Sequence, residues 1–211
     1  NKIRDYLDFA GLQYRNQDKA GDERENMLTL RQKGQEARKD FTELAKAFQA
    51  SHPEWQLQQT SQWMNQAQRL RPHFWVYLQR EGKVTEPMMA LRLYGSSSDF
   101  GASLEVSFIE RKKDEQTLGK QAKVLEVRVV EGIYYLAYSD GQSQRWDANE
   151  ENRQILRNKL SNQEVRKVLV KADISFIENQ SLEVILEKLE ELSKSIDEKL
   201  KELKVMLDED I

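Results

Sequence analysis

The chain has 211 residues, enough for one domain with a sizeable core and an appended element. It is 38% hydrophobic and 33% charged, but its 7 Phe, 7 Tyr and 4 Trp are too many aromatic residues for a disordered chain. It contains no run of 18 apolar residues, no signal-peptide pattern at residues 1–8 and no cysteine. These features predict a cytoplasmic protein without a membrane span, disulfides or thiolate chemistry.

The net charge of -3 is distributed unevenly along the chain. Residues 178–211 hold eleven acidic residues against five lysines, a net charge of -6, so the remainder carries +3. A strong nucleic-acid binder usually concentrates its basic residues in a stripe or patch. The charge balance alone therefore neither requires nor excludes binding to nucleic acid.

A long helix is predicted to begin near Asp22, which forms a capping-box pattern with Glu25. From there, apolar or small residues recur every three or four positions as far as Phe48, the spacing of one helix face. Gly34 lies in the middle of this stripe. Because glycine has no side chain, we expect another element to approach the helix closely at that point.

The rest of residues 1–71 is also predicted to be mainly helical. Residues 1–20 carry scattered apolar positions, which fit a short helix or an ordered arm. A second helix is predicted over 60–70, where Trp63 shares a face with later apolar residues, and Pro72 then biases the chain towards extended structure.

From His73 three strand-like segments follow one another: HFWVYLQR, MMALRLYG and ASLEVSFIER. Turn residues separate them, so we predict an antiparallel meander. Apolar and polar residues alternate in the second and third segments, which gives the sheet one apolar face. Pairing Leu93 with Leu104 aligns the apolar residues of these two strands.

A helix and then further strands are predicted after the meander. Asp140 and Gly141 form a strong signal for a two-residue hairpin turn. Capping patterns at Asp147 and Ser161 predict the starts of two short helices, although residues 165–170 fit a strand equally well.

The predicted fold class is therefore α+β, with a mainly antiparallel central sheet of about four to five strands flanked by helices. The body would comprise residues 1–177, with residues 72–177 forming the sheet and its helices. Residues 178–211 would form a separate C-terminal amphipathic helix.

The C-terminal helix carries a continuous apolar stripe, spaced at three or four residues with one stutter. Its members include Leu182, Ile185, Leu189, Leu192, Ile196, Leu200 and Leu203. At 1.5 Å per residue the helix would be about 40 Å long, more than a core of this size usually covers. We expect the stripe to bind a partner helix, either the similarly patterned residues 27–48 of the same chain, a second copy, or another protein, as in a coiled coil.

Glu110, Arg111 and Lys112 end the third strand of the meander. In the middle of this chain, the predicted order of elements is helix, three strands, helix and strand. This order resembles the core of the PD-(D/E)xK nucleases. In that family an acid and a Glu-x-Lys motif surround Mg²⁺, so the resemblance implies catalytic roles for Glu110 and Lys112. The chain departs from the pattern, because Glu86 is out of phase with Glu110 and Asp99 lies at the far end of the hairpin. A strand end entering solvent is the simpler explanation.

The polar face of the predicted sheet carries aromatic and basic side chains. His73, Trp75 and Tyr77 of the first strand would neighbour Arg92 and Tyr94 of the second. Such a mixture of rings and cations can stack nucleic-acid bases. Alternatively, the N-terminal helices cover this face, because their apolar stripe must be buried somewhere.

Further basic residues after the third strand could bind phosphate, although a solvated helix end explains them as well: Arg111, Lys113, Lys120 and Lys123. The two histidines, His52 and His73, lack metal-ligand spacing, and no cofactor is predicted apart from Mg²⁺ under the nuclease hypothesis.

The sequence therefore leaves two hypotheses for the function. One is a non-enzymatic interaction or assembly protein, and the other is a metal-dependent nuclease-like or nucleic-acid-binding domain.

Overall fold

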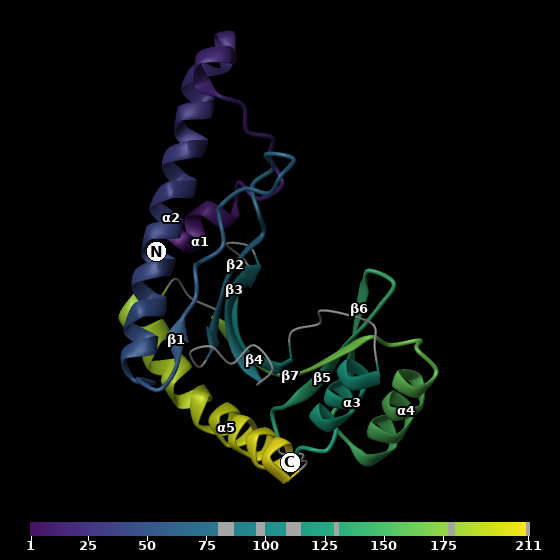
Figure 1. The fold of residues 1–211 in the computed structure, drawn as a ribbon. Helices are drawn as coiled ribbons and strands as arrows, with labels where there is room; N and C mark the ends of the chain where they lie inside the picture. The colour runs from purple at the N-terminus through teal and green to yellow at the C-terminus, as the bar shows by residue number, and fades with distance from the viewer. Residues whose placement is uncertain (80–86, 96–99, 109–114, 129–130, 177–179, 210–211) are drawn as a thin grey trace.

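The computed structural model describes residues 1–79, 87–95, 100–108, 115–128, 131–176 and 180–209 (Figure 1). Its helices are α1 (Lys2–Leu7), α2 (Arg24–Ala50), α3 (Glu115–Val124), α4 (Glu150–Ser161) and α5 (Leu182–Glu209), with short 3₁₀ turns at Gln17–Lys19 and Gly21–Glu23. Its strands are β1 (Gln56–Leu57), β2 (His73–Gln79), β3 (Met88–Gly95), β4 (Phe100–Ser107), β5 (Tyr134–Ser139), β6 (Gln142–Asp147) and β7 (Lys167–Phe176). Among the described residues, no helix combines the length and apolarity that a membrane span requires.

The strands form one antiparallel sheet in the order β1-β2-β3-β4-β7-β5-β6. The predicted α+β class is confirmed, but the seven described strands exceed the four to five expected. The ambiguous region near residues 165–170 belongs to strand β7, which lies between β4 and β5. The last strand of the chain therefore joins the meander to the β5–β6 hairpin.

The meander is confirmed, but the predicted register of its second pair is wrong. Leu93 pairs with Ala102, and Leu104 pairs with Leu91. The error is two residues along the strand. Because side chains alternate with a period of two, such a shift leaves every side chain on its predicted face. The apolar face of the meander was therefore identified correctly.

The helix predicted over residues 60–70 is absent. Instead, the Ser61 amide donates to the carbonyl of Trp75 at the outer edge of β2, at 3.0 Å, and residues 68–70 exchange backbone hydrogen bonds with residues 11–14. A helix of this length is marginal on its own, and the exposed strand edge offers the backbone other partners. The helix predicted from Ser161 is also wrong, because α4 ends there and the chain turns into β7.

The predicted hairpin is confirmed, and the predicted helix that follows it is present with a different cap. Asp140 and Gly141 have φ values of 46° and 78°, as a two-residue turn between antiparallel strands requires. The cap of α4 is Asn149, whose side chain accepts from the Asn152 amide, rather than Asp147. Helix α4 was therefore predicted correctly, but its capping residue was placed two positions too early.

The helices lie on one face of the sheet (Figure 1). The core contains alternate residues of each strand, for example Phe74, Val76 and Leu78 of β2, packed against residues of α1, α2, α3, α4 and α5. The N-terminal helices therefore cover the apolar face of the meander. The opposite face, which carries Trp75, has no described helix on it.

The close approach expected at Gly34 is confirmed. A Cβ atom at this position would overlap the ring of Trp63, which is buried against α2. The ring thus occupies the space that any side chain at Gly34 would need. This contact fixes the segment around residue 63 against the middle of α2.

The C-terminal helix α5 is docked on the body of the protein, mainly on β4, with further contacts to α2 and β7. The stripe residues whose side chains are described are buried or half-buried within the chain: Leu182, Ile185, Leu189, Leu192, Ile196 and Leu203. The side chain of Leu200 lies outside the described part. The apolar stripe therefore packs against the protein's own core, with α2 as one of its neighbours.

His52 joins the end of α2 to α5. Its Nδ1 lies 3.0 Å from the Phe48 carbonyl oxygen, and its Nε2 lies 3.2 Å from Oδ2 of Asp197. The hydrogen bond with Asp197 raises the pKa of His52 above its ordinary value of 6.5, against the opposing effect of burial. The protonated imidazole therefore favours the docked position of α5.

We expect the contribution of His52 to stability to depend on pH. Because its pKa is higher in the folded state than in the unfolded state, this contribution is complete below pH 6.5 and is lost as the pH rises through the folded-state pKa. Urea unfolding of the wild type and of His52→Gln, from about pH 5.5 to about pH 9, measures it. The stability difference between the two proteins should shrink with rising pH. A constant difference would show that Asp197 does not hold the protonated form.

Candidate functional site

The sheet face opposite the helices, called here the open face, is the candidate site. The strand register places the following residues on it: His73, Trp75 and Tyr77 of β2, Arg92 and Tyr94 of β3, Glu105 of β4, Lys171 of β7, and Tyr134 and Tyr138 of β5. The pleat thus brings together Trp75, Tyr77, Arg92 and Tyr94, the sheet residues that the sequence analysis proposed for binding. All four are partly exposed.

Trp75 is the centre of an aromatic and cationic cluster. The guanidinium carbon of Arg71 lies 4.7 Å from the centroid of its ring, and that of Arg92 lies 5.6 Å away. The His73 ring is 5.0 Å from the same indole, centroid to centroid. Cation–π contacts of this kind hold a ring in place while leaving part of its surface accessible. Trp75 is therefore a fixed, partly exposed stacking platform.

Glu105 holds two cations over the middle of the open face. Its Oε1 accepts from Nε of Arg92 at 3.0 Å and lies 3.2 Å from Nζ of Lys171. The carboxylate side chain is only 4% exposed. Burial alone would raise the pKa of Glu105, but Arg92 and Lys171 together hold it below its ordinary value. The three groups are therefore all charged and leave one net positive charge.

Strand β4 is buried on both faces, although no described helix covers its open side. The Tyr94 ring lies across Gly101, where an added Cβ would be 3.0 Å from Cζ of the tyrosine. Arg92 and Lys171 reach over the same strand to Glu105. Beneath them the Ser103 hydroxyl is buried and has no hydrogen-bond partner among the described residues. The accessible layer of the open face thus consists of aromatic and cationic side chains resting on small residues of β4.

The sheet curves around the open face, so this face is concave (Figure 1). Burial raises the pKa of Tyr138 in β5, and Glu105 of β4 raises it further, against the effect of Arg92 in β3. Side chains from β3, β4 and β5 therefore lie near one another on this face. A ligand lying there would contact several strands at once.

A hollow of about 370 Å³ lies at one edge of the open face, where β5 begins and β6 ends. The residues that line it are Glu131, Gly132, Ile133, Tyr134, Arg145, Asp147 and Ala148. The guanidinium carbon of Arg145 lies 3.9 Å from the centroid of the Tyr134 ring, and the Tyr134 hydroxyl donates to Oδ2 of Asp173 at 2.7 Å. A second ring and cation pair therefore lies across the face from Trp75.

The open face is positively charged, in contrast to the chain as a whole. Its described cations are Arg71, Arg92, Arg145, Lys167 and Lys171, and its described acids, including Glu131 of the hollow, are Glu105, Glu131, Asp147 and Asp173. Burial, together with Arg92 and Arg71, lowers the pKa of His73 to about 4, so this residue is neutral at pH 7. The excess of one positive charge contrasts with the net charge of -3 of the chain. An anionic ligand is therefore favoured on this face.

The other predicted site residues are not among the described residues of the open face. Glu110, Arg111, Lys112 and Lys113 lie outside the described residues, so the nuclease hypothesis stays a prediction. Lys120 and Lys123 belong to α3, which packs on the helix-covered side of the sheet. Within the described part of the chain, no group of three His, Asp or Glu residues could hold a metal ion.

The residues that organise the open face carry weak signals in the sequence. Glu105 is one polar position in an alternating strand, and Lys171 directly follows residues 165–170, whose structure the sequence leaves ambiguous. Tyr134 and Tyr138 alternate along β5, which was a usable signal for a shared face. Their proximity to β2 and β3 depends on the strand order and the curvature.

Comparisons with known proteins were negative: no family model matches the chain, and neither a curated protein nor a solved structure is detectably similar. A functional assignment therefore depends on the geometry of the open face.

Proposed function

We propose that the chain is a non-enzymatic binding protein whose open face takes single-stranded nucleic acid. The observation that carries the proposal is the partly exposed ring of Trp75 on a positively charged, concave sheet face. This ring lies against the guanidinium groups of Arg71 and Arg92. Bases of a single strand stack on aromatic side chains, and basic residues along the same groove attract the phosphates. The open face supplies both kinds of group.

A single strand fits this face better than a duplex does. Proteins that read duplex DNA commonly insert a helix or a two-stranded ribbon into the major groove, whereas the described helices pack on the other side of this sheet. Stacking also requires bases whose faces are accessible, which a duplex does not offer. The rings of Trp75, Tyr77 and Tyr94 come from two adjacent strands, so successive bases of one extended strand can reach them.

Trp75→Ala is expected to weaken binding of a fluorescein-labelled oligonucleotide by about 1–3 kcal/mol, or roughly 5- to 150-fold, because one stacking surface is lost. Fluorescence anisotropy at low salt measures the affinity. Trp75→Phe should keep much of it, since a phenyl ring still stacks. Lys188→Gln, on an exposed position of α5, is the control for a general loss of positive charge.

The affinity of the wild type should also fall as salt is added, because phosphate contacts release counterions. Two results would refute the proposal. One is the absence of binding to both single-stranded DNA and RNA at low salt, and the other is an affinity that Trp75→Ala leaves unchanged.

A further inference from the structure

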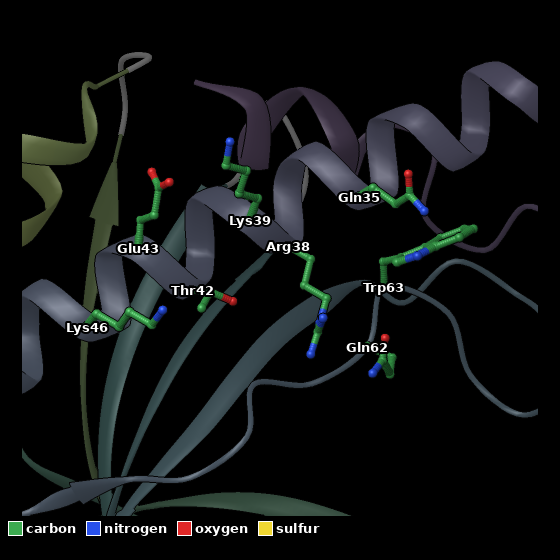
Figure 2. A pocket seen from close by; sticks show the side chains of 8 residues that line it. All are labelled: Gln35, Arg38, Lys39, Thr42, Glu43, Lys46, Gln62 and Trp63. Atoms are coloured by element: carbon green, nitrogen blue, oxygen red, sulfur yellow. The ribbon is translucent and has the colours of Figure 1, made fainter.

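A second polar groove, defined here as the α2 groove, lies between α2 and residues 60–63. It has a volume of about 480 Å³, and its lining residues are Gln35, Arg38, Lys39, Thr42, Glu43, Lys46, Gln62 and Trp63. The six residues from α2 are spaced at three or four positions, so they form one stripe along the helix. In Figure 2 the side chain of Arg38 extends from α2 towards Gln62, the side chain of Lys46 lies along the helix beside Thr42, and those of Lys39 and Glu43 point to the other side of α2.

The α2 groove is positively charged and rich in hydrogen-bond donors. Arg38, Lys39 and Lys46 outnumber the single acid, Glu43. Within the described part of the chain, neither Lys39 nor Lys46 forms an ion pair. Side-chain amides such as those of Gln35 and Gln62 also donate hydrogen bonds to phosphate oxygens. The groove therefore suits an extended polyanion.

In the described part of the chain, residues 60–61 lie between the α2 groove and β2, the strand that carries Trp75. On one side of this segment the Ser61 amide donates to the Trp75 carbonyl, and the Trp75 amide donates to Oγ of Ser61, both at 3.0 Å. On the other side Nε and Nη2 of Arg38 donate to the carbonyls of Ser61 and Thr60, at 3.1 and 3.2 Å. Ser61 thus bonds to the backbone of Trp75 on one side and accepts from Arg38 on the other.

We infer that a single strand bound to the open face continues over residues 60–63 into the α2 groove, where its phosphates contact Lys46 and Arg38. The inference rests on the proposed function and extends it, because it defines a path for the strand and a longer site. Its occupant is the sugar-phosphate backbone of the same strand. The two surfaces share one sign of charge and one boundary segment, which a continuous polyanion can cross.

The path predicts that binding depends on the length of the strand. We would measure anisotropy with oligo(dT) of about 5 and about 15 nucleotides, lengths that bracket short and long sites on single-strand binding folds. Lys46→Gln should weaken binding of the longer strand about fivefold at about 0.1 M salt and reduce its salt slope by about 0.7, the share of one phosphate contact. Binding of the shorter strand should not change.

Lys188→Gln carries the same charge change on an exposed part of α5 and should leave both affinities unchanged. The inference is overturned if Lys46→Gln has no effect, or affects the short and long strands equally. In either case a loss of binding in Trp75→Ala for both lengths would leave the proposed function standing. If Trp75→Ala binds both strands as the wild type does, the proposed function itself fails.

Discussion

Replacing Glu105 by alanine should lower the free energy of unfolding by about 3–5 kcal/mol, the usual cost of removing one partner from a buried charge cluster. The reason is the position of its carboxylate between Arg92 and Lys171, whose side chains are 20% and 12% exposed. Without Glu105, two mostly buried cations would face each other without compensation. The same change should weaken ligand binding, because Glu105 fixes both cations on the open face.

Urea unfolding of Glu105→Ala tests this expectation, with Glu187→Ala on the exposed side of α5 as a control for the loss of an acid. The control should lie within about 0.5 kcal/mol of the wild type. A double change of Glu105 and Lys171 to methionine should recover part of the stability, since it removes a charge together with its partner. A Glu105→Ala protein as stable as the wild type would mean that the two cations do not depend on this carboxylate.

Acidification should have a similar effect. The folded-state pKa of Glu105 is held below its ordinary value, so its contribution is complete above that value and is lost as the pH falls through the folded-state pKa. Acid unfolding of the wild type should therefore show a loss of stability that the Glu105→Ala protein lacks.

Replacing Ile196 by alanine should destabilise the protein by about 2–5 kcal/mol without changing its oligomeric state. Ile196 is fully buried in the core beneath α5, so truncating it leaves a cavity between the helix and the sheet. Val205 lies on the same helix and is 56% exposed, so Val205→Ala is the matched control with little expected effect. Thermal unfolding and light scattering on the three proteins provide both measurements.

The outcome also decides how the apolar stripe of α5 is used. If the stripe served a second copy or another protein, Ile196→Ala would lower the mass of the assembly and leave the stability of the single chain unchanged. The docked position of α5 predicts the reverse. Burial of the stripe also explains the length of α5. The helix packs along β4 and contacts β7 within the same chain, so its stripe does not require a coiled-coil partner.

The elements that the sequence predicted well are those with strong local signals. The stripes of α2 and α5, the alternation of β3 and β4, and the Asp140-Gly141 turn each determine their own local structure. The two wrong helices lie where tertiary contacts decide. In the segment 60–70, Ser61 bonds to the edge of β2 and residues 68–70 bond to residues 11–14, while β7 is paired on both sides, with β4 and β5.

The site was predictable only in part for the same reason. Alternation along β2 and β3 placed Trp75 beside Arg92, because adjacent strands of a meander share a face. The ion cluster around Glu105 requires Lys171 from a strand 66 positions later, whose place in the sheet no local pattern reveals. Nor did the sequence decide which face the helices cover, since that follows from how α2 and α5 pack together on the apolar side.

Intrinsic fluorescence tests the central claim most directly. Trp55 and Trp63 are buried, and Trp146 packs against the core on the helix-covered side, so Trp75 is the tryptophan on the open face. Titration of unlabelled oligo(dT) at low salt should quench the wild type, because a base stacks on Trp75, and should leave Trp75→Phe unquenched although it still binds. Equal quenching of both proteins, or none in the wild type, would contradict a single-strand site on this face.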